Sequence, residues 1–241
     1  MTVPAETVTL PARGWRIDRR KALIIAALCW GGYAVLVWAV TTGRTGTFDD
    51  TGLLFWRGAQ GTAPRGPDWL LEMVRDLTAL GGVLLRHVFA LVAVVALLFL
   101  KLRREALLLA VTIVGGWIVN SGMKALVGRA RPEIVPHLTE AGGASFPSGH
   151  SFNAAVVYIA IALALATLSA RQSVRLTVIG AAIVLSLAIA WSRVWLGVHW
   201  PSDVAAGWLG GAGWAFLAAA LLQRSVEHAA DRAVAANRPH S

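Results

Sequence analysis

The stretch Pro147–Ala170, PSGHSFNAAVVYIAIALALATLSA, shows most directly how this chain folds. Its apolar part, 152–170, is close to the roughly 20 residues that a helix needs to cross the hydrocarbon core of a bilayer. Proline is favoured in the first turn of a helix. The stretch therefore predicts a membrane helix that begins at the polar motif and holds His150 at its start.

Five similar apolar runs flank this stretch. They lie near 22–41, 81–100, 106–125, 176–192 and 204–222. Hydrophobic residues make up 56% of the 241 residues and charged residues only 15%, well below the roughly 25% that is usual in soluble domains. We therefore expect an all-α fold, a six-transmembrane helical bundle that forms one integral-membrane domain over residues 1–241.

The distribution of lysine and arginine predicts how this bundle is oriented, because these residues collect on the cytoplasmic side. Clusters occur before the first run, between the second and third, between the fourth and fifth, and after the sixth. Their members are Arg13, Arg16, Arg19, Arg20, Lys21, Lys101, Arg103, Arg104, Arg171, Arg175, Arg224, Arg232 and Arg238. Six spans place these clusters and both termini in the cytoplasm, and the segments 43–80 and 126–150 on the outer side of the cytoplasmic (inner) membrane.

Two further patterns border the outer side. Arg86 and His87 lie near the start of the second span, where we expect their side chains to reach the interface. Apolar residues recur at helical spacing in 68–80 and favour a helix along the membrane surface. The residues on this expected apolar face are Trp69, Met73, Leu77 and Leu80.

The formal net charge of +9 is typical of a protein that binds nucleic acid, an anionic membrane surface or an anionic substrate. Nucleic acid is not expected, because the basic residues form short clusters between apolar runs rather than one long patch. No group of acidic residues suited to Mg²⁺ occurs near the outer face. The single cysteine, Cys29, excludes an internal disulfide and a cysteine-based metal site. The bilayer and an anionic substrate remain as partners.

The first polar cluster is Lys124-Ala-Leu-Val-Gly-Arg-Ala-Arg131-Pro132, at the outer end of the third span. Cations this close repel one another and favour an anionic ligand, and the planar guanidinium of Arg131 suits a phosphate. A solvated stop signal for the span explains the same pattern equally well. Arg129, inside this run, is expected to reach either a second phosphate or only the interface.

The second cluster is Phe146-Pro-Ser148-Gly149-His150, directly before the fourth span. The first backbone N–H groups of a helix have no internal partner and attract anions. Gly149 allows close approach, Ser148 adds a hydroxyl, and His150 can hold and release a proton near neutral pH. A turn with an exposed histidine is the alternative.

The third cluster runs from Ser192 to Asp203 and contains Arg193 and His199. A carboxylate that binds one imidazole nitrogen leaves the other nitrogen free to attack. An interfacial histidine with an acid at a helix start is the alternative. Six spans bring all three clusters to one outer face, and ionisable groups that converge there favour a joint site.

Together the patterns Lys-x6-Arg-Pro, Pro-Ser-Gly-His and Ser-Arg-x5-His-x3-Asp resemble the type 2 phosphatidic acid phosphatase (PAP2) family, whose pocket pattern also occurs in vanadate-dependent haloperoxidases. The resemblance covers roughly 120–210. It implies that His199 is a nucleophile that forms a phosphohistidine, that Asp203 orients it, and that His150 is the general acid and then the base. It also implies a metal-free and cofactor-free site in which the phosphoryl oxygens are held by Lys124, Arg131, Ser148, Gly149 and Arg193.

The expected function is therefore hydrolysis of a membrane lipid phosphate. Candidate substrates are undecaprenyl pyrophosphate, phosphatidylglycerol phosphate, phosphatidic acid and a lipid A phosphate. A lipid phosphotransferase with the same residues is the alternative. A transporter is disfavoured because the ionisable groups lie at span ends, and an inactive lipid-binding protein is disfavoured because no motif position is missing. The sequence indicates no oligomeric state.

Overall fold

Residues 17–58 and 62–236 are described by the computed structural model of the chain, with side chains up to Leu221. These parts form eight helices, and their only β pairing is an isolated bridge between Arg57 and Pro64. The helices are α1 (Arg19–Thr41), α2 (Gly46–Leu54), α3 (Asp68–Ala79), α4 (Val83–Phe99), α5 (Arg103–Val127), α6 (Gly149–Ala166), α7 (Gln172–Trp195) and α8 (Pro201–Ala236). The prediction of an all-α fold is confirmed.

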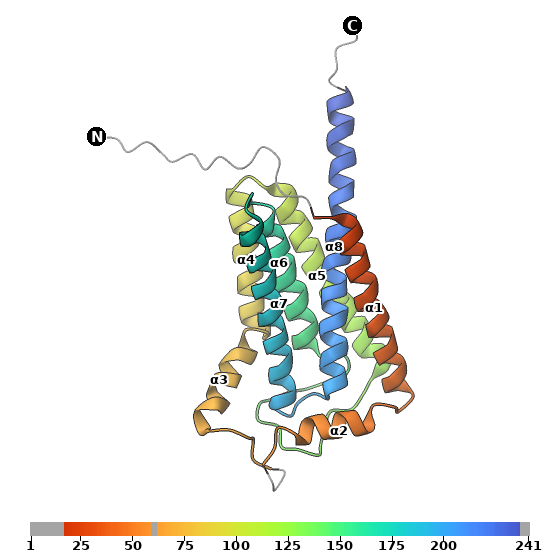
Figure 1. Ribbon diagram of the computed structural model, residues 1–241, viewed down its shortest axis with the longest axis vertical. Coiled ribbons are helices and arrows are strands. Elements are labelled where there is room, and N and C mark those ends of the chain that lie inside the picture. The colour runs from red at the N-terminus through yellow and green to blue at the C-terminus, as the bar shows by residue number, and fades with distance from the viewer. Residues whose placement is uncertain (1–16, 59–61, 237–241) are drawn as a thin grey trace, which may run out of the picture.

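Six of the helices, α1 and α4 to α8, stand side by side as a bundle (Figure 1). Five of them are each long and apolar enough to cross a membrane: α1, α5, α6, α7 and the Pro201–Leu221 part of α8. Helix α4 has 17 residues, which is about 26 Å against a hydrocarbon core of about 30 Å. It reaches the length of a span only together with α3, across a 48° bend. The chain is thus a multi-pass membrane protein with five or six spans, and the second expected span is the short one.

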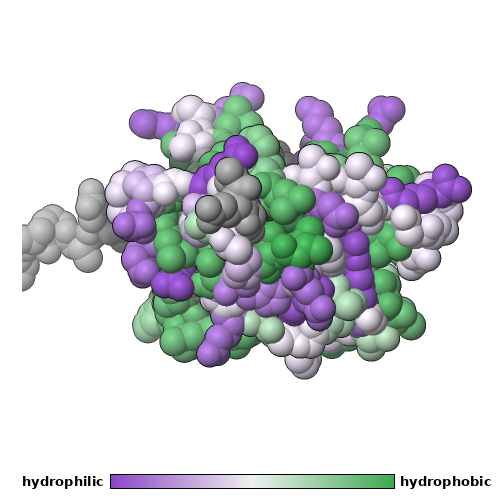
Figure 2. Space-filling model, turned by 90° about the horizontal axis from the view of Figure 1, so that it is seen from below, coloured by the Kyte–Doolittle hydropathy of each residue, from purple (hydrophilic) through white to green (hydrophobic). Residues whose placement is uncertain are grey.

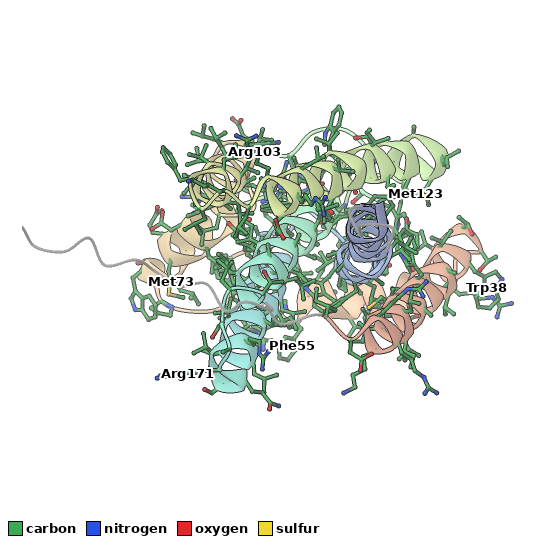
Figure 3. All side chains as sticks on the ribbon, turned by 90° about the horizontal axis from the view of Figure 1, so that it is seen from above. Trp38, Phe55, Met73, Arg103, Met123 and Arg171 are labelled. Atoms are coloured by element: carbon green, nitrogen blue, oxygen red, sulfur yellow. The ribbon has the colours of Figure 1, made fainter. Side chains whose placement is uncertain are left out.

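Helix α6 is the centre of the bundle and packs against α5, α7 and α8 (Figure 3). Its apolar window is 72% buried, compared with 17% for α1 and for α7. Small residues allow this close packing: a Cβ on Gly211 of α8 would overlap the carbonyl group of Phe152 on α6. The start of α6, which carries His150, is therefore held on several sides.

One end of the bundle carries the two short helices. Helix α2 lies across this end, and α3 leans outward from it (Figure 1). Buried Val74 lies on the face of α3 that packs against Trp195 and Leu196, at the end of α7. Only part of the apolar face that was expected in 68–80 packs against the bundle. Leu77 and Leu80 pack against α6 and α7, whereas Trp69 and Met73 stay exposed, with Met73 pointing away from the bundle (Figure 3).

Arg86 does not reach the interface, so this prediction is wrong. Its side chain is only 6% exposed, and its Nη1 donates a hydrogen bond of 3.1 Å to the carbonyl oxygen of Gly81. The break between α3 and α4 leaves this carbonyl free to accept the bond, so the guanidinium turns inward. His87, the next residue, is exposed as expected.

The cationic clusters that were assigned to the cytoplasm lie at the opposite end from α2 and α3, where α1 and α7 begin and where α4 joins α5 (Figure 1). Figure 3 looks onto that end and labels Arg103 and Arg171. Three members of the clusters, Arg13, Arg16 and Arg238, lie outside the described residues, as do the side chains of Arg224 and Arg232.

Candidate active site

The three polar clusters meet at the end of the bundle that carries α2 and α3. The last turns of α5 and α7 and the first turns of α6 and α8 converge there, under the loop 128–148 (Figure 1). Figure 2 looks onto this end and shows hydrophilic residues gathered between apolar ones. Direct bonds join the clusters: Arg131 Nη1 donates to the carbonyl of Val198 at 2.7 Å, and Ser148 N donates to the carbonyl of Asp203 at 3.0 Å.

His199 lies between α7 and α8 and is 2% exposed. Its Nε2 is 3.1 Å from Nη1 of Arg131, and its Nδ1 is 3.2 Å from Oγ of Ser145. A guanidinium can only donate hydrogen bonds, so Nε2 must be the acceptor and the proton of the neutral ring sits on Nδ1. The imidazole thus presents an unprotonated nitrogen to a cation.

Asp203 is completely buried at the start of α8. Its Oδ2 accepts hydrogen bonds from Oγ of Ser145 at 2.5 Å and from the backbone N–H of Trp200 at 3.1 Å. The same Oδ2 is 3.6 Å from Nδ1 of His199, beyond hydrogen-bond distance. The expected direct contact is therefore replaced by the hydroxyl of Ser145, which touches both groups. Sequence reasoning did not single out Ser145, since a serine three positions before Ser148 carries no distinguishing signal.

Arg129 pairs with two buried carboxylates. Its Nη1 lies 2.7 Å from Oδ1 of Asp203, and its Nη2 lies 2.7 Å from Oδ2 of Asp49 on α2. Asp49 also accepts bonds from the N–H and the hydroxyl of Ser202, at 2.9 and 2.7 Å. Neither role expected for Arg129 matches this arrangement, because its guanidinium is occupied by the protein itself. Arg129 thereby links α2 to the start of α8. It binds one carboxylate oxygen of Asp203, and Ser145 binds the other.

The electrostatics keep His199 uncharged. Burial lowers its pKa to about 4, the nearby Asp203 opposes this change, and the cations Arg131 and Arg193 add to it. Burial also lowers the pKa of Arg131, whose guanidinium stays charged in proteins. At neutral pH the ring of His199 is therefore a neutral base beside fixed positive charge.

Three cations of the site lack a counter-ion. Within residues 17–58 and 62–221, no carboxylate lies within 4 Å of Lys124, Arg131 or Arg193. Arg193 is 3% exposed; its Nη1 donates to Oγ1 of Thr78 at 3.0 Å, and its buried Nε has no partner. Lys124 donates to the carbonyl of Ala144 at 2.6 Å. Buried charge without compensation is costly, so the site is built to receive an anion.

The start of α6 differs in one point from what the sequence suggested. Ser148 is fully buried, and its hydroxyl accepts bonds from the N–H and the hydroxyl of Ser151, at 3.4 and 2.9 Å. It caps the helix, so its hydroxyl is already engaged. Gly149 leaves room beside Lys124, since an added Cβ would sit 3.4 Å from Cε of that lysine.

His150 is half-buried and lies against the break between α3 and α4. A Cβ on Gly81 would sit 3.3 Å from its Cδ2. In the parts of the chain that the structure describes, no three His, Cys, Asp or Glu side chains are grouped as a metal ion requires. The arrangement as a whole can hold an anion between cations and present to it one neutral imidazole, with a second imidazole nearby.

Comparison with known proteins agrees with these motifs. The sequence model of the PAP2 superfamily matches residues 105–227, just over half of the chain. Phosphatidylglycerophosphatase B of Bacillus subtilis (strain 168) is 32% identical over 143 residues, which are 58% of this chain and 68% of that protein.

Two further relatives are matched over smaller shares of their length. Undecaprenyl-diphosphatase of Sulfolobus acidocaldarius is 27% identical over 54% of this chain and 62% of that protein. Lipid A 1-phosphatase of Rhizobium etli is 35% identical over 46% of this chain and 47% of that protein. The matches to these two relatives thus cover from about half to less than two thirds of their length.

The fold is similar to a solved structure. A crystal structure of a transmembrane PAP2 type phosphatidylglycerolphosphate phosphatase from Bacillus subtilis superposes with a TM-score of 0.72 at 26% identity. The superposition covers 84% of this chain and 96% of that one. The similarity therefore extends beyond residues 105–227 and includes helices that precede them.

Proposed function

The chain belongs to the PAP2 superfamily, and we propose that it hydrolyses a lipid phosphate or diphosphate through a phosphohistidine on His199. Relatives with 27–35% identity are named phosphatidylglycerophosphatase, undecaprenyl-diphosphatase and lipid A phosphatase. Their substrates differ in the lipid but share a terminal phosphoryl group. The common chemistry, cleavage of a phosphoric ester or anhydride at a lipid headgroup, is what we assign to this chain.

One observation carries the proposal: the unprotonated Nε2 of His199 lies 3.1 Å from the guanidinium of Arg131. Phosphoryl transfer depends mainly on positioning and on neutralising the charge of the equatorial oxygens. A phosphoryl group held by Arg131 would have its phosphorus beside this nitrogen. The other unpaired cations, Lys124 and Arg193, would take the remaining oxygens.

The reaction then has two steps. Nε2 of His199 attacks phosphorus, the P–O bond to the lipid breaks, and His150 donates a proton to an alkoxide leaving group. In the second step His150 takes a proton from water, the water oxygen bonds to phosphorus, and the P–N bond breaks to release inorganic phosphate. Ser145 and Asp203 hold Nδ1 of His199 throughout and stabilise the positive charge that the ring gains.

We also propose that the site faces the outer side of the cytoplasmic membrane. Support comes from the cationic clusters that begin α1 and α7 and join α4 to α5, all at the other end of the bundle. A lipid headgroup on that outer surface would lie level with the loop 128–148.

The test is phosphate release by the detergent-solubilised protein in EDTA, with a panel of lipid phosphates and diphosphates. We expect His199→Ala and His150→Ala to lose at least about 1000-fold in kcat, as removal of a nucleophile or of its proton donor does. An exposed histidine supplies the control: His87→Ala should retain activity, because the contact of this side chain is to the carbonyl of Val83 in its own helix. Full activity in both site variants would refute the mechanism.

The same experiment separates hydrolysis from transfer. With a lipid or sugar alcohol added as acceptor, a phosphotransferase would form the phosphorylated alcohol and release little free phosphate. A hydrolase would release inorganic phosphate with or without the alcohol. An acid-labile, alkali-stable phosphoryl label on the wild-type chain, absent from His199→Ala, would identify the intermediate.

A further inference from the structure

A fourth buried cation lies at the site, outside the three motifs. Arg86 belongs to the first turn of α4, is 6% exposed, and has no carboxylate within 4 Å among the described residues. Its Nη1 is held by the carbonyl oxygen of Gly81 at 3.1 Å. An arginine in a membrane-spanning helix is costly and is usually retained for a function. A hydrogen bond to one carbonyl does not balance its charge.

Arg86 and His150 both lie against the same residue, Gly81. Gly81, whose carbonyl holds Arg86, is also the residue whose added Cβ would sit 3.3 Å from Cδ2 of His150. The charge of Arg86 acts on His150 together with the charges of Arg193 and Arg131. Arg193 reaches the same turn, since its Nη1 donates to Oγ1 of Thr78, and the carbonyl of Thr78 accepts from the N–H of Gly81.

His150 marks the side of the leaving group, because it is the residue that would donate the proton there. A lipid monophosphate leaves as an alkoxide, which needs that proton. A lipid diphosphate leaves as a phosphate ester, which is a stable anion and needs positive charge instead. A guanidinium beside His150 matches the second case, since arginine binds phosphate with paired hydrogen bonds.

We propose that Arg86 forms a second anion subsite that binds the lipid-linked phosphate of a diphosphate, so that this chain prefers lipid diphosphates to lipid monophosphates. The inference rests on the proposed function and concerns the substrate class at the same site. Lys124, Arg131 and Arg193 then hold the phosphoryl group that is transferred, and Arg86 neutralises the phosphate that leaves. A diphosphate carries about one more negative charge than a monophosphate, and Arg86 is the additional cation.

The discriminating experiment compares two substrates that differ only in the second phosphate, farnesyl diphosphate and farnesyl monophosphate, in detergent with EDTA. We expect the wild-type chain to prefer the diphosphate. Arg86→Gln should lower the ratio of kcat/KM for the diphosphate to that for the monophosphate by about 10- to 100-fold, as the loss of a charged phosphate contact does. Arg86→Lys, which keeps the positive charge, should retain part of the preference for the diphosphate. Arg44→Gln, an exposed arginine outside the site, should leave it unchanged.

A structural role for Arg86 predicts a different result. If the residue only fastens the turn between α3 and α4, Arg86→Gln should lower activity on both substrates equally and leave the ratio unchanged. That outcome would overturn the proposal, as would a wild-type ratio near one.

A second measurement keeps the idea testable if Arg86→Gln does not fold. Inorganic pyrophosphate should bind the His199→Ala variant at least about 10-fold more tightly than inorganic phosphate, measured by calorimetry in EDTA; equal affinities would overturn the second subsite. The binding result is independent of turnover. A wild-type chain that releases no phosphate from any lipid would refute the proposed function, whereas an active chain with no preference would refute only the subsite.

Discussion

The hydroxyl of Ser145 lies 2.5 Å from Oδ2 of Asp203 and thereby takes the place that the imidazole of His199 was expected to hold. Asp203 acts on His199 through this hydroxyl, which is also 3.2 Å from Nδ1 of the ring. The carboxylate is further fixed from its other oxygen by Arg129. The orientation of the proposed nucleophile therefore depends on two residues outside the pattern that relates the chain to its family.

The link through Ser145 predicts a selective loss of turnover. Ser145→Ala removes one donor to Asp203 and the partner of Nδ1 of His199, so the ring should be held less firmly in its orientation. We expect kcat to fall about 10-fold or more with KM nearly unchanged, because a hydrogen bond to a charged group contributes roughly 1.5–3 kcal/mol. Steady-state kinetics measure this. A rise in KM at constant kcat would show instead that Ser145 contributes to substrate binding.

Removal of Arg129 is expected to destabilise the fold more than any other single change near the site. Arg129→Ala leaves the buried carboxylates of Asp49 and Asp203 without their cation, at a cost of about 3 kcal/mol or more. Thermal unfolding in detergent should show a markedly lower Tm. The double variant Arg129→Ala/Asp49→Asn should recover part of the loss, since one of the two orphaned charges is gone. Arg44→Ala serves as the control, and a Tm equal to that control would contradict the assigned ion pairs.

The burial of His199 predicts an unusually low pKa for its imidazole. Because its pKa is about 4 in the folded state and roughly 6.5 when unfolded, the folded chain binds fewer protons between these values. Stability should therefore rise as the pH increases from about 4 to about 6.5, and the ring should be neutral at pH 6. NMR of labelled histidine, assigned by comparison with His199→Gln, measures the midpoint. Arg131→Gln should raise it, since Arg131 lowers the pKa; a wild-type midpoint near 6.5 would contradict the geometry.

The turn before His199 requires a glycine at position 197. Gly197 has a φ of +77°, and an added Cβ would lie 2.6 Å from Nη2 of Arg57 and 2.8 Å from the carbonyl oxygen of Pro136. Gly197→Ala should displace the turn, lower Tm and reduce activity by at least about 10-fold. Gly43→Ala is a matched control, because its φ of +71° gives the same strain of about 1 kcal/mol with no atom within 4 Å of the added Cβ. Equal effects of the two changes would show that the collision at Gly197 is unimportant.

Much of the fold could be predicted from the sequence, because a hydrophobic run of about 20 residues can adopt few structures in a bilayer. The runs predicted α1, α5, α6, α7 and the Pro201–Leu221 part of α8 closely, whereas α8 itself continues to Ala236. The second run became α4, which is short because the glycines at 81 and 82 break it from α3. The direction that α3 takes at this break is set by its packing against α7, and hydropathy alone does not contain this information.

The residues of the candidate site, too, could be predicted from the sequence only in part. The residues with direct chemical character, such as His150, His199 and Arg131, were evident from residue type and spacing, and their clustering at one end followed from the number of spans. Ser145, Arg129 and Asp49 were not evident, because a serine, an arginine and an aspartate at a membrane surface are ordinary there. Only the contacts between distant segments give these residues their roles.

The sequence by itself determined a helical membrane protein of the PAP2 superfamily, since both the length of apolar runs and the spacing of motif residues are local properties of the chain. The tertiary structure decided which groups surround those motifs. It turned Arg86 inward onto the carbonyl of Gly81, placed Ser145 between His199 and Asp203, and paired Arg129 with two carboxylates. The physical reason is that buried charges and hydrogen-bonding groups must find partners wherever the packing of helices places them, and those partners are remote in sequence.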